Sequence, residues 1–553
     1  MGQSNAMKRR DFLAASSLPW LVAGCAQPAA ITGGFVGAAQ ARGHLLRTAT
    51  WPAPARVRRT GVLIAGGGVA GLAAARALRL RGMQDFTVLE LEDSAGGNSR
   101  GGDVNGIPCP LGAHYLPVPG NHAAHVQDLL EELGLRQRVS GRWVYDERHL
   151  CHSPQERLFI NGEWQDGLLP VHDIDARTLA DYQRFAQLVR AASSAESFQV
   201  PVSNRPLRQP SIALDAINFE SWLNQAQLTS PALRWYLDYC CRDDYGAGLA
   251  TVSAWAGLHY FASRHGFSAP GGEPSAEREA GVLTWPQGNG WLTQQLAQPL
   301  GERLVTGQIV CRIVVGKHGV EVDAFDTTTQ TVHRWQAEQC IVALPLFVAA
   351  RVLHTPPPAL REAASALRYA PWLVANIHIK TALHDRPGAA PSWDNVFYGP
   401  DMAANPPSDA SGLGYVDAMH QSLAAVPGAT VLTHYRAFGI EAAARKNLYD
   451  QPWTHWRDTV LAELSVPHPD LLEKVTRIDV VRYGHAMSVP VPGTRGHSAL
   501  RALRTPQQGQ RLHFAHSDLS GYSVFEEAFS HGHARGAAVA KAVTSSRQVP
   551  SKT

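Results

Sequence analysis

The stretch GVLIAGGGVAG, residues 61–71, decides the fold class that we expect for this chain of 553 residues. Its first half is short and apolar, which is typical of a strand buried on both faces of a sheet. Gly66, Gly68 and Gly71 then match the spacing G-x-G-x-x-G. In that motif the first glycine allows a tight turn, the second lets the backbone approach a diphosphate, and the third lets a helix pack on the strand. The stretch therefore predicts a Rossmann-like domain that binds a dinucleotide.

The residues that follow support the same prediction. Residues 72–78 favour a helix, and its first turn, with Val69 and Ala70, would face the diphosphate because helix N-terminal amides attract anions. A second apolar run, 86–89, ends at Glu90, about 20 residues beyond the glycines, where a carboxylate can accept hydrogen bonds from both ribose hydroxyls. The strand, the turn, the helix, the second strand and the acid thus follow one another in the order and spacing of the dinucleotide-binding motif.

Composition and charge exclude several classes of protein. The chain is 45% hydrophobic and 18% charged, as a globular protein is. Its net charge of +3 comes without a basic run, so we expect no nucleic-acid partner. The 7 cysteines fit neither a metal-ligand spacing nor a dense disulfide framework. The close histidine pairs near the C-terminus, His513 with His516 and His531 with His533, do not resemble a zinc site, so we expect no metal.

The N-terminus resembles a bacterial export signal. A twin arginine, Arg9-Arg10, precedes the apolar residues 12–24, which are too few to span a bilayer that needs about 20. The string LVAGC that follows resembles a lipobox, which implies a lipid on Cys25. We expect export by the twin-arginine pathway to the periplasm or cell envelope, with membrane contact only through that anchor. The predicted segments are a signal peptide, residues 1–25, and a linker that need not pack on the core, residues 26–55.

Beyond the glycine turn, the sequence resembles the FAD-dependent amine oxidase superfamily, which includes protoporphyrinogen oxidases and carotenoid desaturases. The string VLE at residues 88–90 and the glycine pair ending at Gly97 resemble its VLE…GGR signature. Here Asn98 and Ser99 separate the glycines from Arg100, which is a departure from the pattern. The resemblance implies FAD as the cofactor, with Gly97, Asn98 and Arg100 beside it.

Later segments carry the same resemblance. Residues 110–115 resemble the loop beside the isoalloxazine, residues 304–310 the strand that meets adenine, and residues 512–528 the C-terminal flavin segment. The cofactor-binding positions that the resemblance implies are Gly112, Ala113, His114, Val310, Asp518 and Phe525, the last at the start of a helix aimed at the flavin.

Two residues of the C-terminal segment depart from the family pattern. His516 and Glu527 stand where glycine is usual. A carboxylate beside a flavin carbonyl that gains negative charge on reduction would be repelled. We therefore expect the Glu527 side chain to turn outward.

The matching segments predict two domains whose parts interleave along the chain. The FAD-binding domain would comprise residues 56–149, 283–350 and 505–545, and the substrate domain residues 150–282 and 351–504. The substrate segments show both the helical spacing of three and four and the alternation of a strand. The expected fold class is α/β, with a Rossmann-like FAD-binding domain of the glutathione-reductase type and a substrate domain of mixed sheet plus helices.

Four residues are candidates for the substrate side of the flavin. His114 and Tyr115 come from the flavin loop, Asn376 from a predicted strand, and Tyr522 matches a tyrosine that forms half of an aromatic cage in amine oxidases. In those enzymes a lysine commonly stands five residues after a tyrosine of this strand, but here the position is Val374. For His114 an acid–base role and a simple hydrogen-bonding role both stay open.

These features predict an FAD-dependent oxidoreductase that oxidises a small organic substrate, such as an amine or polyamine, by hydride transfer to FAD. The absent lysine favours one alternative, a desaturase-like or protoporphyrinogen-oxidase-like enzyme with an apolar substrate. The replaced glycines favour another, an envelope lipoprotein that keeps FAD without catalysis. The electron acceptor stays open between oxygen, a quinone and a carrier protein.

Overall fold

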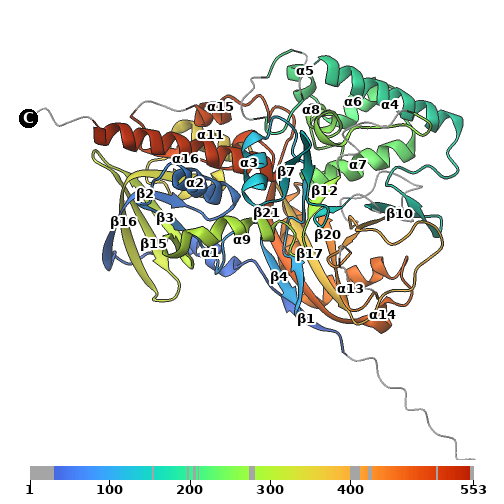
Figure 1. Ribbon diagram of the computed structural model, residues 1–553, viewed down its shortest axis with the longest axis horizontal. Coiled ribbons are helices and arrows are strands. Elements are labelled where there is room, and N and C mark those ends of the chain that lie inside the picture. The colour runs from blue at the N-terminus through green and yellow to red at the C-terminus, as the bar shows by residue number, and fades with distance from the viewer. Residues whose placement is uncertain are drawn as a thin grey trace, which may run out of the picture.

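The computed structural model describes most of the chain as two units, each built on one large sheet (Figure 1). The described residues are 30–151, 155–195, 198–202, 207–209, 211–272, 281–398, 412–420, 422, 426–505 and 509–548. The predicted signal peptide, with Arg9, Arg10 and Cys25, lies outside them. None of the described helices is both long enough and apolar enough to cross a membrane.

The first unit, called here the Rossmann unit, contains a 7-stranded sheet. Its path runs β13 (Leu304–Val305), β3 (Phe86–Leu89), β2 (Arg56–Ala65), β16 (Thr331–Val342), β15 (Val320–Asp326) and β14 (Gln308–Val315), with β22 (Leu512–Phe514) also beside β16. Strands β13, β3, β2, β16 and β22 are parallel, so their carboxyl ends meet at one edge. That edge carries the turns that follow β2, β3, β16 and β22.

Helices cover both faces of this sheet. They are α2 (Val69–Leu80), α3 (Ala124–Glu132), α9 (Gly290–Ala297), α10 (Leu346–Val352), α11 (Pro358–Ala366), α15 (Ser498–Arg504) and α16 (Phe525–Gln548). Helices α2 and α16 lie closely against each other, because a Cβ on Gly532 would come within 2.0 Å of the Ala70 carbonyl oxygen. This contact places the second turn of α16 beside the first turn of α2.

The second unit, called here the substrate unit, contains an 8-stranded mixed sheet. Its strands, in spatial order, are β1 (Thr32–Phe35), β21 (Val475–Val489), β17 (Arg368–Ile379), β20 (Thr430–Ala437), β19 (Tyr415–Asp417), β18 (Asp394–Phe397), β10 (Glu156–Ile160) and β11 (Glu163–Asp166). One group of helices lies beyond its upper end in Figure 1: α4 (Ala176–Ala195), α5 (Ser211–Asp215), α6 (Phe219–Gln225), α7 (Pro231–Tyr245) and α8 (Ala254–Tyr260). The others are α12 (Ala442–Asp450), α13 (Trp453–Leu464) and α14 (Leu471–Lys474).

Short strands and turns join the two units. The three small sheets contain β6 (Tyr115–Pro117), β12 (Val282–Thr284) and β9 (Leu150–Cys151); β4 (Gly101–Val104) and β5 (Ile107–Pro110); and β7 (Arg136–Val139) and β8 (Arg142–Tyr145). A π-turn follows α8 at Phe261–His265, and 3-10 turns lie at Gln298–Arg303 and Ser517–Ser520. Strand β6 pairs with β12 in antiparallel orientation, so residues 115–117 lie beside residues 282–284, far along the chain.

The structure places α11 and α15, which lie in the predicted substrate segment 351–504, on the Rossmann sheet. It also corrects the predicted linker at residues 26–55. Its residues Thr32–Phe35 form β1, which pairs in parallel with β21, and Gln40–Thr48 form helix α1. The many Ala, Gly and Pro residues of the segment hid both elements, because a strand at a sheet edge needs only backbone partners and α1 has no fully buried residue. Residues 30–55 therefore belong to the fold.

Candidate functional site

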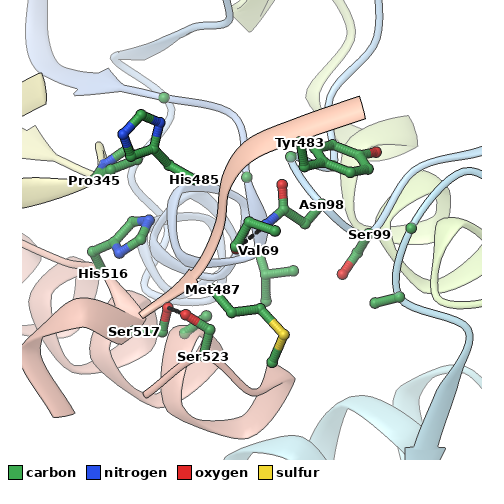
Figure 2. A pocket seen from close by; sticks show the side chains of 18 of the residues that line it. Val69, Asn98, Ser99, Pro345, Tyr483, His485, Met487, His516, Ser517 and Ser523 are labelled. Carbon is green, nitrogen blue, oxygen red and sulfur yellow. Dashed lines mark hydrogen bonds between the residues drawn. The ribbon is translucent and has the colours of Figure 1, made fainter. Parts of the chain in front are cut away.

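One cavity of about 710 Å³ lies where the two units meet, within the range of roughly 300–1,000 Å³ that ligand sites occupy. Side chains from three parts of the chain surround it in Figure 2. They come from the Rossmann unit, such as Val69 and Asn98, from β21, such as His485 and Met487, and from the C-terminal segment, such as His516. The cavity thus combines residues that the sequence separates by hundreds of positions.

Glycine turns form the floor of one end of the cavity. Gly66, which follows β2, has φ +104° and Gly97 has φ +60°, conformations that favour glycine. The two turns are joined, since Gly96 N–H donates to the Gly67 carbonyl at 2.9 Å. A Cβ on Gly68 would face open space, with only the Gly97 Cα at 3.9 Å. The backbone is therefore bare where a diphosphate would lie.

Glu90 stands at the end of β3 with its carboxylate fixed by backbone amides. Gly67 N–H donates to one oxygen at 2.7 Å and Glu92 N–H to the other at 2.9 Å. Burial raises the pKa of Glu90, and the two amide hydrogen bonds oppose that effect. The arrangement holds an acceptor at the place where a ribose would bind.

Arg100 reaches the cavity despite the two residues inserted before it. Its side chain is buried, donates to the Gly97 carbonyl at 3.1 Å and forms an ion pair with Glu92 at 3.4 Å. Asn98 also lines the cavity and donates to the Ala486 carbonyl of β21. The departure from the family pattern therefore leaves both side chains at the site.

Asp518 lies on the other side of the glycine-lined end of the cavity. One oxygen accepts from Tyr369 O–H at 2.6 Å and from Leu346 N–H at 2.9 Å, while the second oxygen, Oδ1, is buried without a hydrogen bond. Burial raises the pKa of Asp518. His516, which lies 3.2 Å from Oδ1, and the hydrogen bonds to Asp518 lower this pKa by more, so its net shift is downward. Asp518 is thus a buried carboxylate with one acceptor still available.

The far end of the cavity has aromatic walls. His114 stacks on Tyr435, with ring centroids 4.3 Å apart, and Tyr115 lies beside it at 5.0 Å. Trp372 and Val374, both of β17, complete the lining there. Burial lowers the pKa of His114 to about 3, so its ring is neutral at physiological pH. This end can hold a planar ring or a small organic molecule away from water.

The sequence profile of the flavin-containing amine oxidoreductases matches residues 69–540. The chain belongs to this family. An L-amino acid dehydrogenase of Synechocystis sp. is 26% identical over 310 residues, which cover 54% of this chain and 59% of that protein. The matched region thus spans little more than half of this curated relative.

Solved structures share the fold of the family at low identity. Putrescine oxidase bound to putrescine has a TM-score of 0.61 at 17% identity, covering 87% of this chain and 99% of that one. A CLA-producing fatty acid isomerase from P. acnes has a TM-score of 0.60 at 15% identity, covering 86% and 97%. The fold class that the sequence predicts is confirmed.

The residues present fit FAD, the flavin cofactor that the family implies. The glycine floor leaves room that a Cβ at Gly68 would fill, and Glu90 and Asp518 present fixed carboxylates. Gln308 lines the cavity near Val310, and its amide oxygen is buried without a hydrogen bond. A ligand with ribose hydroxyls and an amino-bearing base would satisfy these groups. Of the predicted cofactor residues, the cavity is lined by Gly66, Gly68, Val69, Ala70, Glu90, Gly97, Asn98, Arg100, Gly112, Ala113, His114, Val310, Asp518 and Phe525.

Gly71 supports the site without lining it. A Cβ there would lie 1.9 Å from the Gly66 carbonyl oxygen, so glycine is needed for α2 to pack on the turn. Phe525 is the first residue of α16, as predicted, and faces the cavity. The start of α16 therefore lies at the cavity.

Two of the four catalytic candidates lie elsewhere. Asn376 is fully buried, donates to the Pro110 carbonyl at 3.0 Å and accepts from Thr433, so it is a structural link between strands. Tyr522 is turned into the helical core, where its hydroxyl donates to Glu527 at 3.0 Å. Neither lines the cavity: Asn376 shares the face of β17 that carries Val374 but lies further along the strand, against the Pro110 carbonyl, and Tyr522 points to Glu527. We correct both placements; His114 and Tyr115 do line the cavity.

The prediction that Glu527 turns outward is wrong. Its side chain is fully buried and accepts from Tyr522, Ser520 and Val202 N–H, the last at 2.6 Å. Burial raises its pKa. The carboxylate avoids the cavity by finding three donors in the protein interior, which the sequence around it does not reveal.

Sequence reasoning missed a charged group at the aromatic end. Asp243 and Asp244 stand in the last turn of helix α7, and Arg264 and Glu526 lie near them; all four line the cavity. Arg264 donates to both oxygens of Glu526, at 2.7 and 2.9 Å, and pairs with Asp244 at 3.4 Å. Consecutive acids at a helix C-terminus oppose the helix dipole, and that signal could have found Asp243 and Asp244.

Gly68→Val tests the glycine floor. The added side chain would project into the open space above Gly97, so we expect the purified protein to fold but to lose bound FAD. Absorbance near 450 nm against protein concentration measures the flavin content. A variant that keeps stoichiometric FAD would refute this placement of the diphosphate.

Proposed function

We propose that this chain is an FAD-dependent oxidoreductase that oxidises a cationic amine, and that its preferred substrates are diamines or polyamines. The observation that carries the proposal is Asp243, a carboxylate that lines the cavity and has neither a hydrogen bond nor an ion pair with any described residue. A carboxylate held in a cavity without a partner is costly unless a cation joins it. A substrate ammonium would supply that cation.

The local charge favours a cation over a carboxylate. The only arginine near Asp243 among the described cavity-lining side chains, Arg264, already serves Glu526 and Asp244. One guanidinium between two carboxylates leaves a net negative charge before Asp243 is counted. An amino acid substrate, suggested by the relative from Synechocystis, would have to compete with Glu526 for Arg264. We therefore rank amino acids second.

Further acids lie behind Asp243. Burial and the nearby Asp244 raise the pKa of Asp243 to about 7, with Glu156 adding to the effect and Arg242 opposing it. Burial, Asp243 and Glu156 in turn raise the pKa of Asp394 well above its usual range. Carboxyls that perturb one another in this way mark candidate functional sites. Several acids together suit a substrate that carries more than one ammonium.

The aromatic walls complete the proposed substrate site. Tyr115, Trp372 and Tyr435 would contact the carbon chain of an amine and exclude water from it. A purely apolar substrate, as in the desaturase-like alternative, would leave Asp243 desolvated without a partner. These acids therefore favour an amine substrate, although Val374, which lines the cavity, replaces the lysine that is common in amine oxidases.

Bound FAD would supply the acceptor for a hydride from the substrate carbon. The residues of this chain would bind and orient the substrate. Asp243 would fix a distal ammonium, and the aromatic residues would direct the other amine toward the end lined by Ala113 and His114. His114, with a pKa near 3, would stay neutral, and no lysine lines the described cavity to exchange a proton. The reacting amine would therefore have to enter that end uncharged.

A substrate panel tests this proposal as a whole. Under anaerobic conditions, a diamine or polyamine should bleach the flavin faster than a monoamine, an amino acid or an apolar compound. Bleaching by amino acids alone would favour the second candidate, and bleaching by an apolar compound alone would favour the desaturase-like alternative. Silence across the panel, with a protein partner recovered, would favour a non-catalytic role.

We further propose that the protein is exported and anchored through Cys25. The support is the sequence alone: the twin arginine, the short apolar stretch and the string that ends at Cys25. The twin-arginine pathway carries folded proteins, so FAD could be bound before export. β1 begins at Thr32, so only a short stretch would separate the anchor from the fold.

Asp243→Asn should lower kcat/KM for a diamine by about tenfold to a hundredfold, chiefly through KM, because a charged hydrogen bond contributes roughly 1.5–3 kcal/mol. The value for a monoamine should change by less than about threefold. Steady-state kinetics measure both, with Asp128→Asn, an exposed acid on α3, as the control. Equal losses for the two substrates would contradict a role in binding the distal ammonium.

The pH dependence of KM offers an independent check. With a pKa of about 7, Asp243 is largely protonated at pH 6 and ionised at pH 8. Since only the ionised form attracts an ammonium, KM for a diamine should fall as the pH rises through 7. Deprotonation of the reacting amine lowers KM with pH in both proteins, so the Asp243→Asn variant should lose only the inflection near pH 7. An inflection near pH 7 that persists in that variant would assign it to another group.

Cys25→Ser tests the anchor. In a bacterial host with a twin-arginine pathway, the wild type should sediment with membranes and take up labelled palmitate. The variant should be exported but stay soluble. Replacement of Arg9-Arg10 by Lys-Lys should keep the protein in the cytoplasm, and export of that variant would argue against this pathway.

A further inference from the structure

We propose that residues 38–47, around helix α1, form a wall of the FAD site and hold the cofactor in place. The segment precedes residue 69, where the match to the family begins. It is therefore a feature of this chain beyond the matched region. The proposal rests on FAD binding and is independent of the substrate.

The segment is fixed to the substrate unit at its start. β1 pairs with β21 from Thr32↔Arg477 to Phe35↔Val480, and Val36 N–H continues the ladder to the Val480 carbonyl at 2.9 Å. Arg482 lies over the Phe35 ring at 3.4 Å from its centroid. The chain thus leaves the sheet edge in a defined direction.

The N-terminal turn of α1 is held by the loop after Glu90. Ala39 N–H donates to both carboxylate oxygens of Glu92, at 2.9 and 3.2 Å. Arg42 donates to the Leu91 carbonyl at 3.2 Å and to Asp93 at 2.7 Å. These contacts attach the helix to the loop that positions the ribose-binding carboxylate.

The C-terminal turn of α1 is held by helix α10. Arg351 donates to the Leu46 carbonyl at 2.6 Å and to the Arg47 carbonyl at 3.3 Å. A cation that satisfies free carbonyls is a usual end for a helix. With both ends held, α1 bridges β3 and α10 across the carboxyl edge of the Rossmann sheet.

Held in this way, α1 lines the same cavity as Glu90, Gln308 and Val310. The lining residues of the segment are Ala38, Ala39, Gln40, Gly43, His44, Leu46 and Arg47. Gln308 supplies the independent sign of a ligand, because its buried amide oxygen lacks a hydrogen bond. A Cβ added to Gly43 would meet nothing within 4 Å, so α1 leaves open space on the cavity side. The adenosine half of FAD would occupy it.

Gly43→Leu in the holoenzyme tests this placement. Leucine favours a helix more than glycine does, so the change does not weaken α1 itself. Its side chain would enter the space assigned to the cofactor, and we expect FAD to dissociate at least about tenfold faster. Gly34→Leu is the matched control, because Gly34 also has nothing within 4 Å of an added Cβ but lies in β1, away from the cavity.

Recovery of flavin fluorescence after dilution measures the release of FAD without reference to activity. Circular dichroism of each variant checks the fold. Limited proteolysis adds a second readout, since bound FAD should slow tryptic cleavage after the exposed Arg47 in the wild type and less so in Gly43→Leu. If both glycine variants release FAD at the wild-type rate and cleavage after Arg47 does not respond to FAD, α1 is no part of the site. A wild type without FAD would instead overturn the cofactor assignment.

Discussion

The contact between two glycine turns is the constraint on which the site depends. Gly96 N–H donates to the Gly67 carbonyl, and Gly68 and Gly97 face each other with no side chain between them. Any Cβ at Gly68 would occupy the space where a diphosphate can approach bare amides. The parallel strands β2 and β3 deliver both turns to one edge of the sheet, so the fold and the binding surface follow from the same short stretch.

From that floor, a chain of polar contacts extends to the outer wall. Arg100 holds the Gly97 carbonyl and pairs with Glu92, and Glu92 accepts from Ala39 at the start of α1. Each group in this chain is buried or half-buried, so a lost member would leave its neighbour without a partner. The N-terminal segment and the glycine floor are therefore coupled, although 57 positions separate Ala39 from Gly96 (96 − 39 = 57). Residues that the sequence predicts as a linker thus help to define the cofactor site.

Local rules predicted the parts of the site that depend on neighbours in sequence. The glycine spacing, Glu90 at the end of β3 and the start of α16 at Phe525 all follow from motifs a few residues long. Asn376 and Glu527 were misplaced because the direction of each side chain depends on a partner far along the chain, and Tyr522 was misplaced because its hydroxyl follows Glu527 into the interior. Glu527, for example, is satisfied by Val202, which no pattern near residue 527 indicates. The linker was missed for the same reason, since β1 exists only through its pairing with β21.

The two ends of the cavity differ in charge, and the difference is not required by the fold. At the floor, backbone amides and Arg100 suit an anion. At the aromatic end, Asp243 and Asp244 stand on the last turn of α7, where the helix dipole disfavours negative charge. Arg264 compensates Asp244 but not Asp243, whose pKa rises to about 7. Under the proposed function, a bound cation would offset the cost of this charge at the cavity, and that cost would become selectivity for an ammonium.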